Sequence, residues 1–147
     1  MKHSLILAFI SLLALPALAE IAKAAEPERI TVQHILIAFK GSIPDDPRVT
    51  RSKQEAEKLA LQIFERAKAG EDFDAMVKTY TNDSHPGIYK IANKGVAADR
   101  SKGEFPRTGM VAAFGDVGFK LEVGGIGLAA YDSAKSPYGW HIIKRLE

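Results

Sequence analysis

The chain has 147 residues, a formal net charge of +2 and no cysteine. Without cysteine it can have no disulfide framework, no thiol nucleophile and no lipid-modified N-terminal cysteine. The near balance of 20 basic and 18 acidic residues gives no argument for binding to nucleic acid, and the length is enough for one domain with a single hydrophobic core.

The first 19 residues have the pattern of a secretory signal peptide. A short basic start precedes an apolar run over residues 4–15, and the Ala-Leu-Ala that follows has the small-x-small pattern of a cleavage site. We expect cleavage after Ala19, with a second candidate near Ala24 or Ala25. The apolar run is too short and wrongly flanked for a good membrane span, although an uncleaved N-terminal anchor is the alternative. We therefore expect an exported protein, periplasmic or secreted, with no stable membrane insertion after cleavage.

A leader, a strand and a loop are expected at the start of the mature chain. Residues 20–28 are rich in alanine and charged residues and indicate a flexible leader. Residues 30–37 alternate in a way that predicts a strand. Residues 40–49 contain glycine, two prolines and two consecutive aspartates, which indicates a loop. The folded domain is therefore expected to cover residues 29–147.

Two helices are expected next. The sequence Ser52-Lys-Gln-Glu55 is a capping box, which is the signature of a helix N-terminus. The apolar residues that follow repeat at i, i+3, i+4 and i+7 on one face: Ala56, Leu59, Ala60, Ile63, Phe64 and Ala67. Gly70 ends this helix, and the same spacing over residues 73–80 predicts a shorter second helix.

The second half of the chain has weaker patterns. Residues 82–103 contain Pro86 and several glycines but no sustained period, so they are expected to be irregular. A short helix is expected in the apolar patch that follows, which comprises Met110, Val111, Phe114, Val117 and Phe119. A strand can lie within residues 123–131, and the final strand is expected over residues 139–146. This order predicts a single α+β domain with a small antiparallel sheet surrounded by helices.

Two histidines occur in the first and last predicted strands. His34 lies in the sequence Ile-Thr-Val-Gln-His-Ile-Leu-Ile, and His141 lies in Tyr-Gly-Trp-His-Ile-Ile-Lys-Arg. Burying a histidine among apolar and β-branched residues costs free energy unless its ring is hydrogen-bonded. A lone strand histidine is more often structural, but two of them suggest neighbouring strands that hold one polar network.

Several segments form a pattern that is specific only when they are taken together and in order. They are His34-Ile-Leu-Ile, Thr50-Arg-Ser-Lys-Gln-Glu-Ala-Glu, Gly70-Glu-Asp-Phe73, Tyr80-Thr-Asn-Asp83, Gly103-Glu-Phe105, Gly109-Met110 with Phe114 and Phe119, and Gly139-Trp-His141-Ile-Ile-Lys-Arg145. The pattern resembles the parvulin family of peptidyl-prolyl cis/trans isomerases, and the resemblance covers residues 30–147. It implies a parvulin-like domain with an inserted loop at about residues 84–102.

The resemblance implies an active site with a polar floor. His34 and His141 match the paired histidines of that floor, and Asp83 matches an aspartate or cysteine position beside the substrate carbonyl. Ser136 falls at a hydroxyl position that hydrogen-bonds the histidine network. A zinc site made of the two histidines and Asp83 is chemically possible, but no clustered ligand spacing supports it.

The resemblance also implies an apolar wall for a proline pocket, matched by Met110 and Phe114 with Phe105 as a further substrate-binding residue. By their helical spacing alone, Met110 and Phe114 would more often be core residues. The family's usual Gly-Asp-Leu-Gly is here Arg-Ser-Lys-Gly, so that Lys102 replaces an apolar wall residue. Lys102 would then contact the substrate and favour an acidic residue before proline. The inserted loop would act as a lid, a specificity loop or a block.

The function that the resemblance implies is peptidyl-prolyl cis/trans isomerisation that assists the folding of exported proteins. The substrates would be proline-containing polypeptides, with no cofactor, metal or nucleic acid, and the protein would act as a monomer. Catalysis would be non-covalent, through stabilisation of the twisted X-Pro amide. The alternative is a non-catalytic, chaperone-like module that binds proline-containing unfolded segments. A hydrolase is a weaker alternative, because the chain has neither cysteine nor a Gly-x-Ser-x-Gly elbow.

Overall fold

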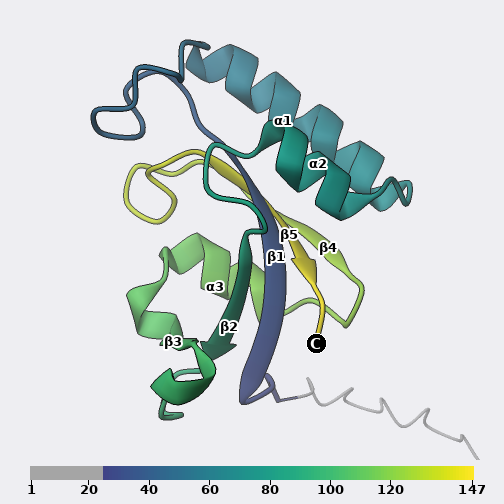
Figure 1. Ribbon diagram of the computed structural model, residues 1–147, viewed down its shortest axis with the longest axis vertical. Helices are drawn as coiled ribbons and strands as arrows, with labels where there is room; N and C mark the ends of the chain where they lie inside the picture. Colours follow the sequence, from purple (N-terminus) through teal and green to yellow (C-terminus); the bar gives the residue numbers. More distant parts are fainter. Residues whose placement is uncertain (1–24) are drawn as a thin grey trace, which may run out of the picture.

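A five-stranded sheet carries helices on both of its faces (Figure 1). The computed structural model describes residues 25–147, and the predicted signal peptide, residues 1–19, lies outside the described residues. In chain order the elements are β1 (Arg29–Ile37), α1 (Lys53–Lys68), α2 (Phe73–Tyr80), β2 (Ile88–Ala92), the 3₁₀ helix η1 (Arg100–Lys102), β3 (Glu104–Pro106), the 3₁₀ helix η2 (Arg107–Gly109), α3 (Ala112–Gly118), β4 (Ile126–Ala129) and β5 (Trp140–Arg145). Within residues 25–147, no helix combines the length and the apolar character that crossing a membrane requires.

The order of the strands is β3-β2-β1-β5-β4, so the first strand of the domain lies at the centre of the sheet. β1 pairs antiparallel with β2 on one side and with β5 on the other, and β5 pairs antiparallel with β4. In the β1–β5 ladder His34 is opposite Ile143, and Leu36 is opposite His141. Because residues two apart on a strand point to the same face, the two histidines lie diagonally on one face of the sheet.

Two strands were not predicted from the sequence. The segment 82–103, expected to be irregular, contains β2, so that prediction is wrong at Ile88–Ala92. A five-residue strand between glycine-containing turns is too short for its period to stand out. β3 pairs parallel with β2, which adds one parallel pairing to an otherwise antiparallel sheet. The α+β class, the three predicted helices and the strands β1, β4 and β5 are confirmed.

α1 begins at the predicted capping box. The backbone N–H of Glu55 donates to the Ser52 hydroxyl at 3.2 Å, and the N–H of Ser52 donates to the Glu55 carboxylate at 2.6 Å. The residues that α1 buries are Ala56, Ala60, Ile63 and Ala67. α2 is capped at its N-terminus by Asp72, whose carboxylate accepts a hydrogen bond from the N–H of Ala75 at 2.9 Å. Both helices therefore start at a side chain that satisfies a free backbone donor.

Alternate residues of β1 and β5 enter two separate hydrophobic clusters. The cluster that packs against α1 and α2 includes Ile35, Ile37, Trp140 and Ile142. The cluster that packs against α3 includes Ile30, Val32 and Ile143. In Figure 1, α1 and α2 lie together at the top and α3 lies at the lower left, with β1 and β5 running between them. The period of two along each strand produces this division into two faces.

The described end of the predicted leader is attached to the domain. The Glu26 carboxylate accepts a hydrogen bond from Nη1 of Arg107 at 2.6 Å, and the N–H of Asn93 donates to the Glu28 carbonyl at 2.8 Å. The described end of the predicted leader over residues 20–28 thus has hydrogen bonds to the domain, and the flexibility of the leader stays a prediction. The physical reason is that Arg107 is buried and its charge requires carboxylate partners.

Candidate active site

The two strand histidines meet at the floor of a cleft on the α3 face of the sheet. Nδ1 of His34 lies 3.1 Å from Nδ1 of His141, and the two rings are stacked with 14° between their planes. Both side chains are buried. Nε2 of His34 lies 3.0 Å from Oδ2 of Asp83. The prediction that the two histidines share one polar network is confirmed, and Asp83 belongs to that network.

Hydrogen-bond chemistry determines where the protons of this network lie. An ionised carboxylate can only accept, so Nε2 of His34 donates to Asp83. When His34 is neutral, its Nδ1 is an acceptor, and Nδ1–H of His141 donates to it. Nε2 of His141 then carries a buried lone pair that has no hydrogen-bond partner among residues 25–147.

The surroundings of His141 and Asp83 give the two side chains different charge states. Burial lowers the pKa of His141 to about 3, and the neighbouring His34 acts in the same direction, so His141 is neutral near pH 7. The hydrogen bond from His34 holds the pKa of Asp83 well below its usual range against the opposing effect of burial, and the N–H of Ser84 and the hydroxyl of Tyr89 add to it. The floor thus combines a neutral buried imidazole with a carboxylate that stays ionised.

Asp83 is positioned by the two residues that precede it, because both bind β1. The N–H of Asn82 donates to the Leu36 carbonyl at 2.8 Å, and the N–H of Leu36 donates to the Thr81 hydroxyl at 3.1 Å. The side-chain oxygen of Asn82 accepts a hydrogen bond from the N–H of Ala38 at 3.0 Å. These bonds hold the chain after α2 beside the strand that carries the first histidine.

An apolar wall faces the polar floor. The cleft has a volume of about 340 Å³, which is typical of ligand-binding pockets, and is lined by Met110, Val111 and Phe114 around the start of α3. The Phe114 ring is edge-on to both histidine rings, with centroid distances of 5.0 and 5.6 Å. The structure thus places Met110 in the wall of the cleft and Phe114 in the core directly behind it, and their role as a proline pocket stays a prediction.

Tyr89 is a cleft residue that was not predicted from the sequence. It lies on β2, and its hydroxyl donates to Oδ2 of Asp83 at 2.9 Å. The available signal was the strand-like run Ile88-Tyr-Lys-Ile-Ala92, which lies between Pro-Gly and Asn-Lys-Gly turns. Ile43 and Tyr138, from the loops before α1 and before β5, also line the cleft.

Ser136 does not bond to the histidine network as expected. It is fully buried, and its hydroxyl donates to the carbonyl of Gly139 at 2.8 Å. Its backbone N–H donates to the Asp132 carbonyl at 2.9 Å. A serine in a turn readily satisfies itself on nearby backbone, and this is the reason for the difference. Ser136 therefore stabilises the turn that leads into β5, the strand that carries His141.

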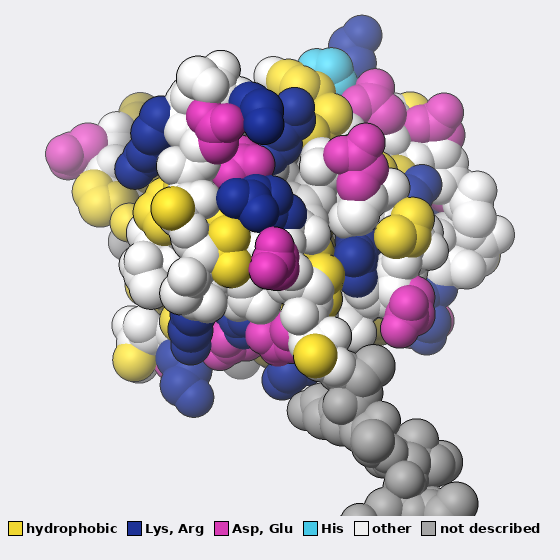
Figure 2. All heavy atoms as spheres, turned by 90° about the horizontal axis from the view of Figure 1, so that it is seen from below, with side chains coloured by type: hydrophobic (Ala, Val, Ile, Leu, Met, Phe, Trp, Pro, Cys, Tyr) yellow, Lys and Arg dark blue, Asp and Glu magenta, His cyan; other side chains and the backbone are white. Residues whose placement is uncertain are grey.

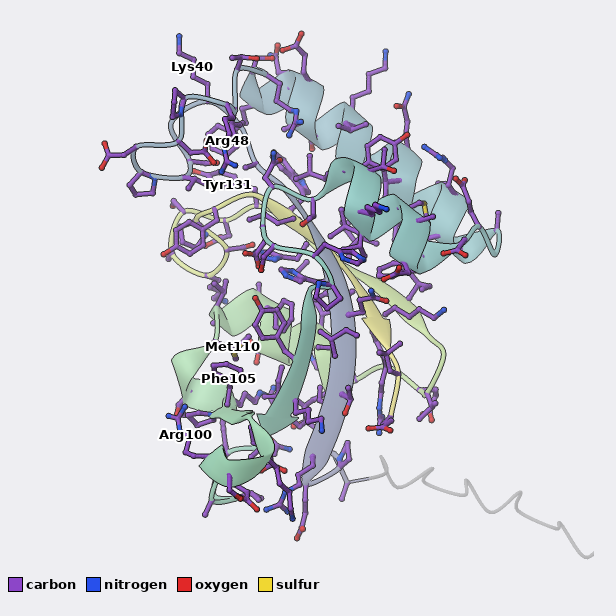
Figure 3. All side chains as sticks on the ribbon, viewed as in Figure 1. Lys40, Arg48, Arg100, Phe105, Met110 and Tyr131 are labelled. Atoms are coloured by element: carbon purple, nitrogen blue, oxygen red, sulfur yellow. The ribbon has the colours of Figure 1, made fainter. Side chains whose placement is uncertain are left out.

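Lys102 and Phe105 do not line the cleft. Nζ of Lys102 lies 3.3 Å from the Asp99 carboxylate, and the side chain borders a separate hollow. The prediction that Lys102 replaces a wall residue is wrong, because η1 places it away from the cleft. Phe105 is 42% exposed, and its ring lies 5.7 Å from that of Tyr89, which does line the cleft. Figure 3 shows Phe105 and Met110 on the same side of the sheet.

The cleft has little charge around it. Asp83 is its one carboxylate, and no lysine or arginine within the described range lines it. Arg48, in the loop after β1, is bonded to Asp46 at 2.8 and 2.7 Å, and neither it nor Lys40, which Figure 3 labels in the same loop, lines the cleft. On the face that Figure 2 shows, basic and acidic side chains are interspersed. In residues 25–147, no group of three or more His, Cys, Asp or Glu side chains is placed to bind a metal ion.

Stacked histidines on the central and neighbouring strands of an α+β domain, beneath an apolar wall, define a parvulin-type domain. The PPIC-type PPIase domain family matches residues 17–147 of this sequence. The chain belongs to this family of peptidyl-prolyl isomerase domains.

Relatives of the chain include larger proteins. Foldase protein PrsA from Caldanaerobacter subterraneus is 39% identical over 88 residues, which are 60% of this chain and 24% of that protein. Chaperone SurA from Pseudomonas fluorescens is 31% identical over 119 residues, which are 81% of this chain and 23% of that protein. The chain thus spans about a quarter of the length of these two relatives. The peptidyl-prolyl isomerase ESS1 from Candida albicans shares the fold, with a TM-score of 0.57 at 19% identity over 82% of this chain and 63% of that one.

Proposed function

We propose that this chain is a peptidyl-prolyl cis/trans isomerase that assists the folding of exported proteins. The observation that carries the proposal is the network of His34, His141 and Asp83 at the floor of an apolar-walled cleft. Membership of the family and the similarity to a foldase and a chaperone support it. The substrates are polypeptide segments that contain an X-Pro bond.

Isomerisation of an X-Pro bond requires rotation about an amide without breaking a covalent bond. The barrier is about 20 kcal/mol, because resonance stabilises the planar forms and is lost at the twisted midpoint. Resonance also moves electron density from the nitrogen to the oxygen, so the planar amide carries the larger charge separation. A site accelerates the rotation when it holds the proline and favours the twisted amide over the planar one.

The cleft can both hold the proline and favour the twisted amide. Met110 offers an apolar surface to the proline ring and helps to exclude water from the amide, and the buried Phe114 ring backs this surface and packs on both histidines. The ionised Asp83 disfavours the negative charge that resonance places on a neighbouring carbonyl oxygen, which weakens the partial double bond. His34 holds the Asp83 carboxylate in place, and the neutral His141 supports His34.

Refolding kinetics test the proposal. A protein whose slow refolding phase is limited by an X-Pro bond should refold faster when a trace of this protein is added, and its fast phases should not change. The Met110→Ala variant serves as the matched control, because it should lose most of the acceleration and remain folded. An unchanged slow phase, together with binding of the unfolded substrate, would contradict the isomerase function and support the chaperone-like alternative.

We also propose that residues 1–19 direct the chain out of the cytoplasm. The basic start, the apolar run and the Ala-Leu-Ala sequence support this. When the full chain is expressed in a bacterium, N-terminal sequencing of the exported product should begin at Glu20. An intact chain retained in the cytoplasm would contradict the proposal.

A further inference from the structure

We propose that Tyr89 is a positioning residue of the active site, whose hydroxyl aligns the Asp83 carboxylate with His34 and whose ring supports the cleft. This inference rests on the proposed isomerase function. Tyr89 lies on β2, in the segment that was expected to be irregular, and none of the sequence motifs includes it.

The two side-chain donors to Asp83 come from neighbouring strands. Tyr89 is opposite Val32 in the β1–β2 ladder, and His34 lies two residues further along β1, so Tyr89 and His34 are diagonal neighbours on one face. Both donate to the same atom, Oδ2 of Asp83, at 2.9 and 3.0 Å. The Asp83 side chain is 35% exposed in a loop, so solvent alone would leave its rotation free. Two donors from rigid strands fix its orientation better than one.

The Tyr89 hydroxyl is a constant donor at neutral pH. Burial raises the pKa of Tyr89 to about 12, and the hydrogen bond to Asp83 and the charge of Asp83 act in the same direction. The hydroxyl therefore keeps its proton, and that proton points to a carboxylate that can only accept.

The ring of Tyr89 is held among three other rings. It is edge-on to His34 with centroids 5.3 Å apart, and its centroid lies 5.9 Å from that of Phe114 and 5.7 Å from that of Phe105. Such packing fixes the ring and so fixes where the hydroxyl points. It also gives Phe105 a structural role, since Phe105 supports the ring that lines the cleft without lining it itself.

The Tyr89→Phe variant separates the hydroxyl from the ring. We expect kcat to fall by about tenfold, because one hydrogen bond to a charged group is lost. We expect KM to stay within about twofold of the wild-type value, because the cleft keeps its shape. Tyr131→Phe is the matched control and should change neither constant, since Tyr131 packs on Phe39 and Trp140 outside the cleft. An unchanged kcat in Tyr89→Phe would overturn the proposal.

A second measurement distinguishes failure of this inference from failure of the isomerase function. The carboxyl ¹³C resonance of Asp83 reports its ionisation whether or not the protein is active. In Tyr89→Phe the titration midpoint of Asp83 should move upward, because a donor that favours the charged form is lost. An unmoved midpoint would overturn the link between the two residues. A shifted midpoint in a protein whose wild type is inactive would overturn the isomerase function on which the positioning role rests.

Discussion

The two faces of the sheet are built from alternate residues of the same strands, yet they bury different chemistry. Toward α1 and α2, β1 and β5 contribute to an apolar core the residues Ile35, Ile37, Trp140 and Ile142. Toward α3, the alternate positions include His34 and His141, which are buried as well. The first face buries mainly apolar side chains, and its buried polar residue Gln33 donates a hydrogen bond to Asp74 of α2. The second face places two polar rings at buried positions, and these rings require hydrogen-bond partners.

The α3 side also holds the buried polar atoms that lack partners. Within residues 25–147 these atoms are Nε2 of His141 and Nε of Arg107. The Arg107 guanidinium lies over the Phe119 ring at 4.5 Å, next to α3. Buried polar atoms without partners lower stability. The comparison indicates that the α1 and α2 face contributes more to the stability of the domain. The α3 face contributes less, because it buries the polar groups that form the site.

The largest effect should come from a cavity in the apolar face. Ile63 of α1 is fully buried, and Ile63→Ala removes apolar contacts that the surroundings cannot replace. We expect the free energy of unfolding to fall by about 2–5 kcal/mol in urea denaturation. Turnover per folded molecule should not change, since Ile63 lies on the other face from the cleft. A large loss of turnover in the folded variant would show that the two faces are not independent.

Met110→Ala, on the α3 face, should have the opposite effect from Ile63→Ala: a small loss of stability and a large loss of turnover. Met110 is partly buried in the cleft wall, so its truncation should cost about 1 kcal/mol of stability. Turnover should fall roughly tenfold to hundredfold, because the proline ring loses apolar contact. The measurement is the acceleration of a proline-limited refolding phase at saturating and limiting substrate. Full turnover in this variant would mean that the pocket lies elsewhere.

Lowering the pH should weaken the α3 face through His141. Its folded-state pKa of about 3 lies below its ordinary value of 6.5. Between pH 3 and pH 6.5, His141 is therefore protonated in the unfolded chain and neutral in the folded chain. The stability from this group is therefore fully present above pH 6.5 and is lost toward pH 3, by up to about 1.4 kcal/mol per unit.

Urea denaturation at pH 7 and pH 5.5 measures this decline. His141→Gln should reduce it, because the variant has no imidazole to protonate at that position. His85→Gln is the matched control and should keep most of the decline, since the His85 side chain is 42% exposed. An equal decline in wild type and His141→Gln would contradict the assignment of a neutral, buried His141.

The smallest effect should come from the end of the leader. Glu26 is one of two carboxylates on Arg107, and Asp116 remains at 2.8 Å when Glu26 is lost. Glu26→Gln should lower the free energy of unfolding by less than about 1 kcal/mol in thermal unfolding. The control is Glu28→Gln, because the Glu28 side chain is 81% exposed and should contribute nothing measurable. If Glu26→Gln lowered turnover as much as Met110→Ala does, the result would show instead that the leader is part of the active site.

Local signals were sufficient to predict most of the α1 and α2 face. The capping box at Ser52 sets the start of α1, and the helical period of its apolar residues sets the buried face. These signals act within a few residues of one another, so tertiary contacts do not override them. The histidine pair was also predictable, because β1 and β5 are long enough for their alternation to place both rings on one face.

The remaining parts depend on contacts between distant segments. β2 is only five residues long, so its strand-like sequence is a weak signal, and its pairing with β1 brings Tyr89 to Asp83. Lys102 was misplaced because the direction of a 3₁₀ helix cannot be read from three residues. Ser136 was misassigned because a backbone acceptor within its own turn competes with a distant imidazole.

The most direct test of the α3 face as a catalytic site is NMR exchange spectroscopy on a short Ala-Pro peptide with a trace of the protein. Wild type should accelerate cis/trans exchange, and so should Ile63→Ala at equal folded concentration. Asp83→Ala should remain folded, because its side chain is 35% exposed, and should lose most of the acceleration. No acceleration by folded wild type, or equal acceleration by Asp83→Ala, would contradict the account.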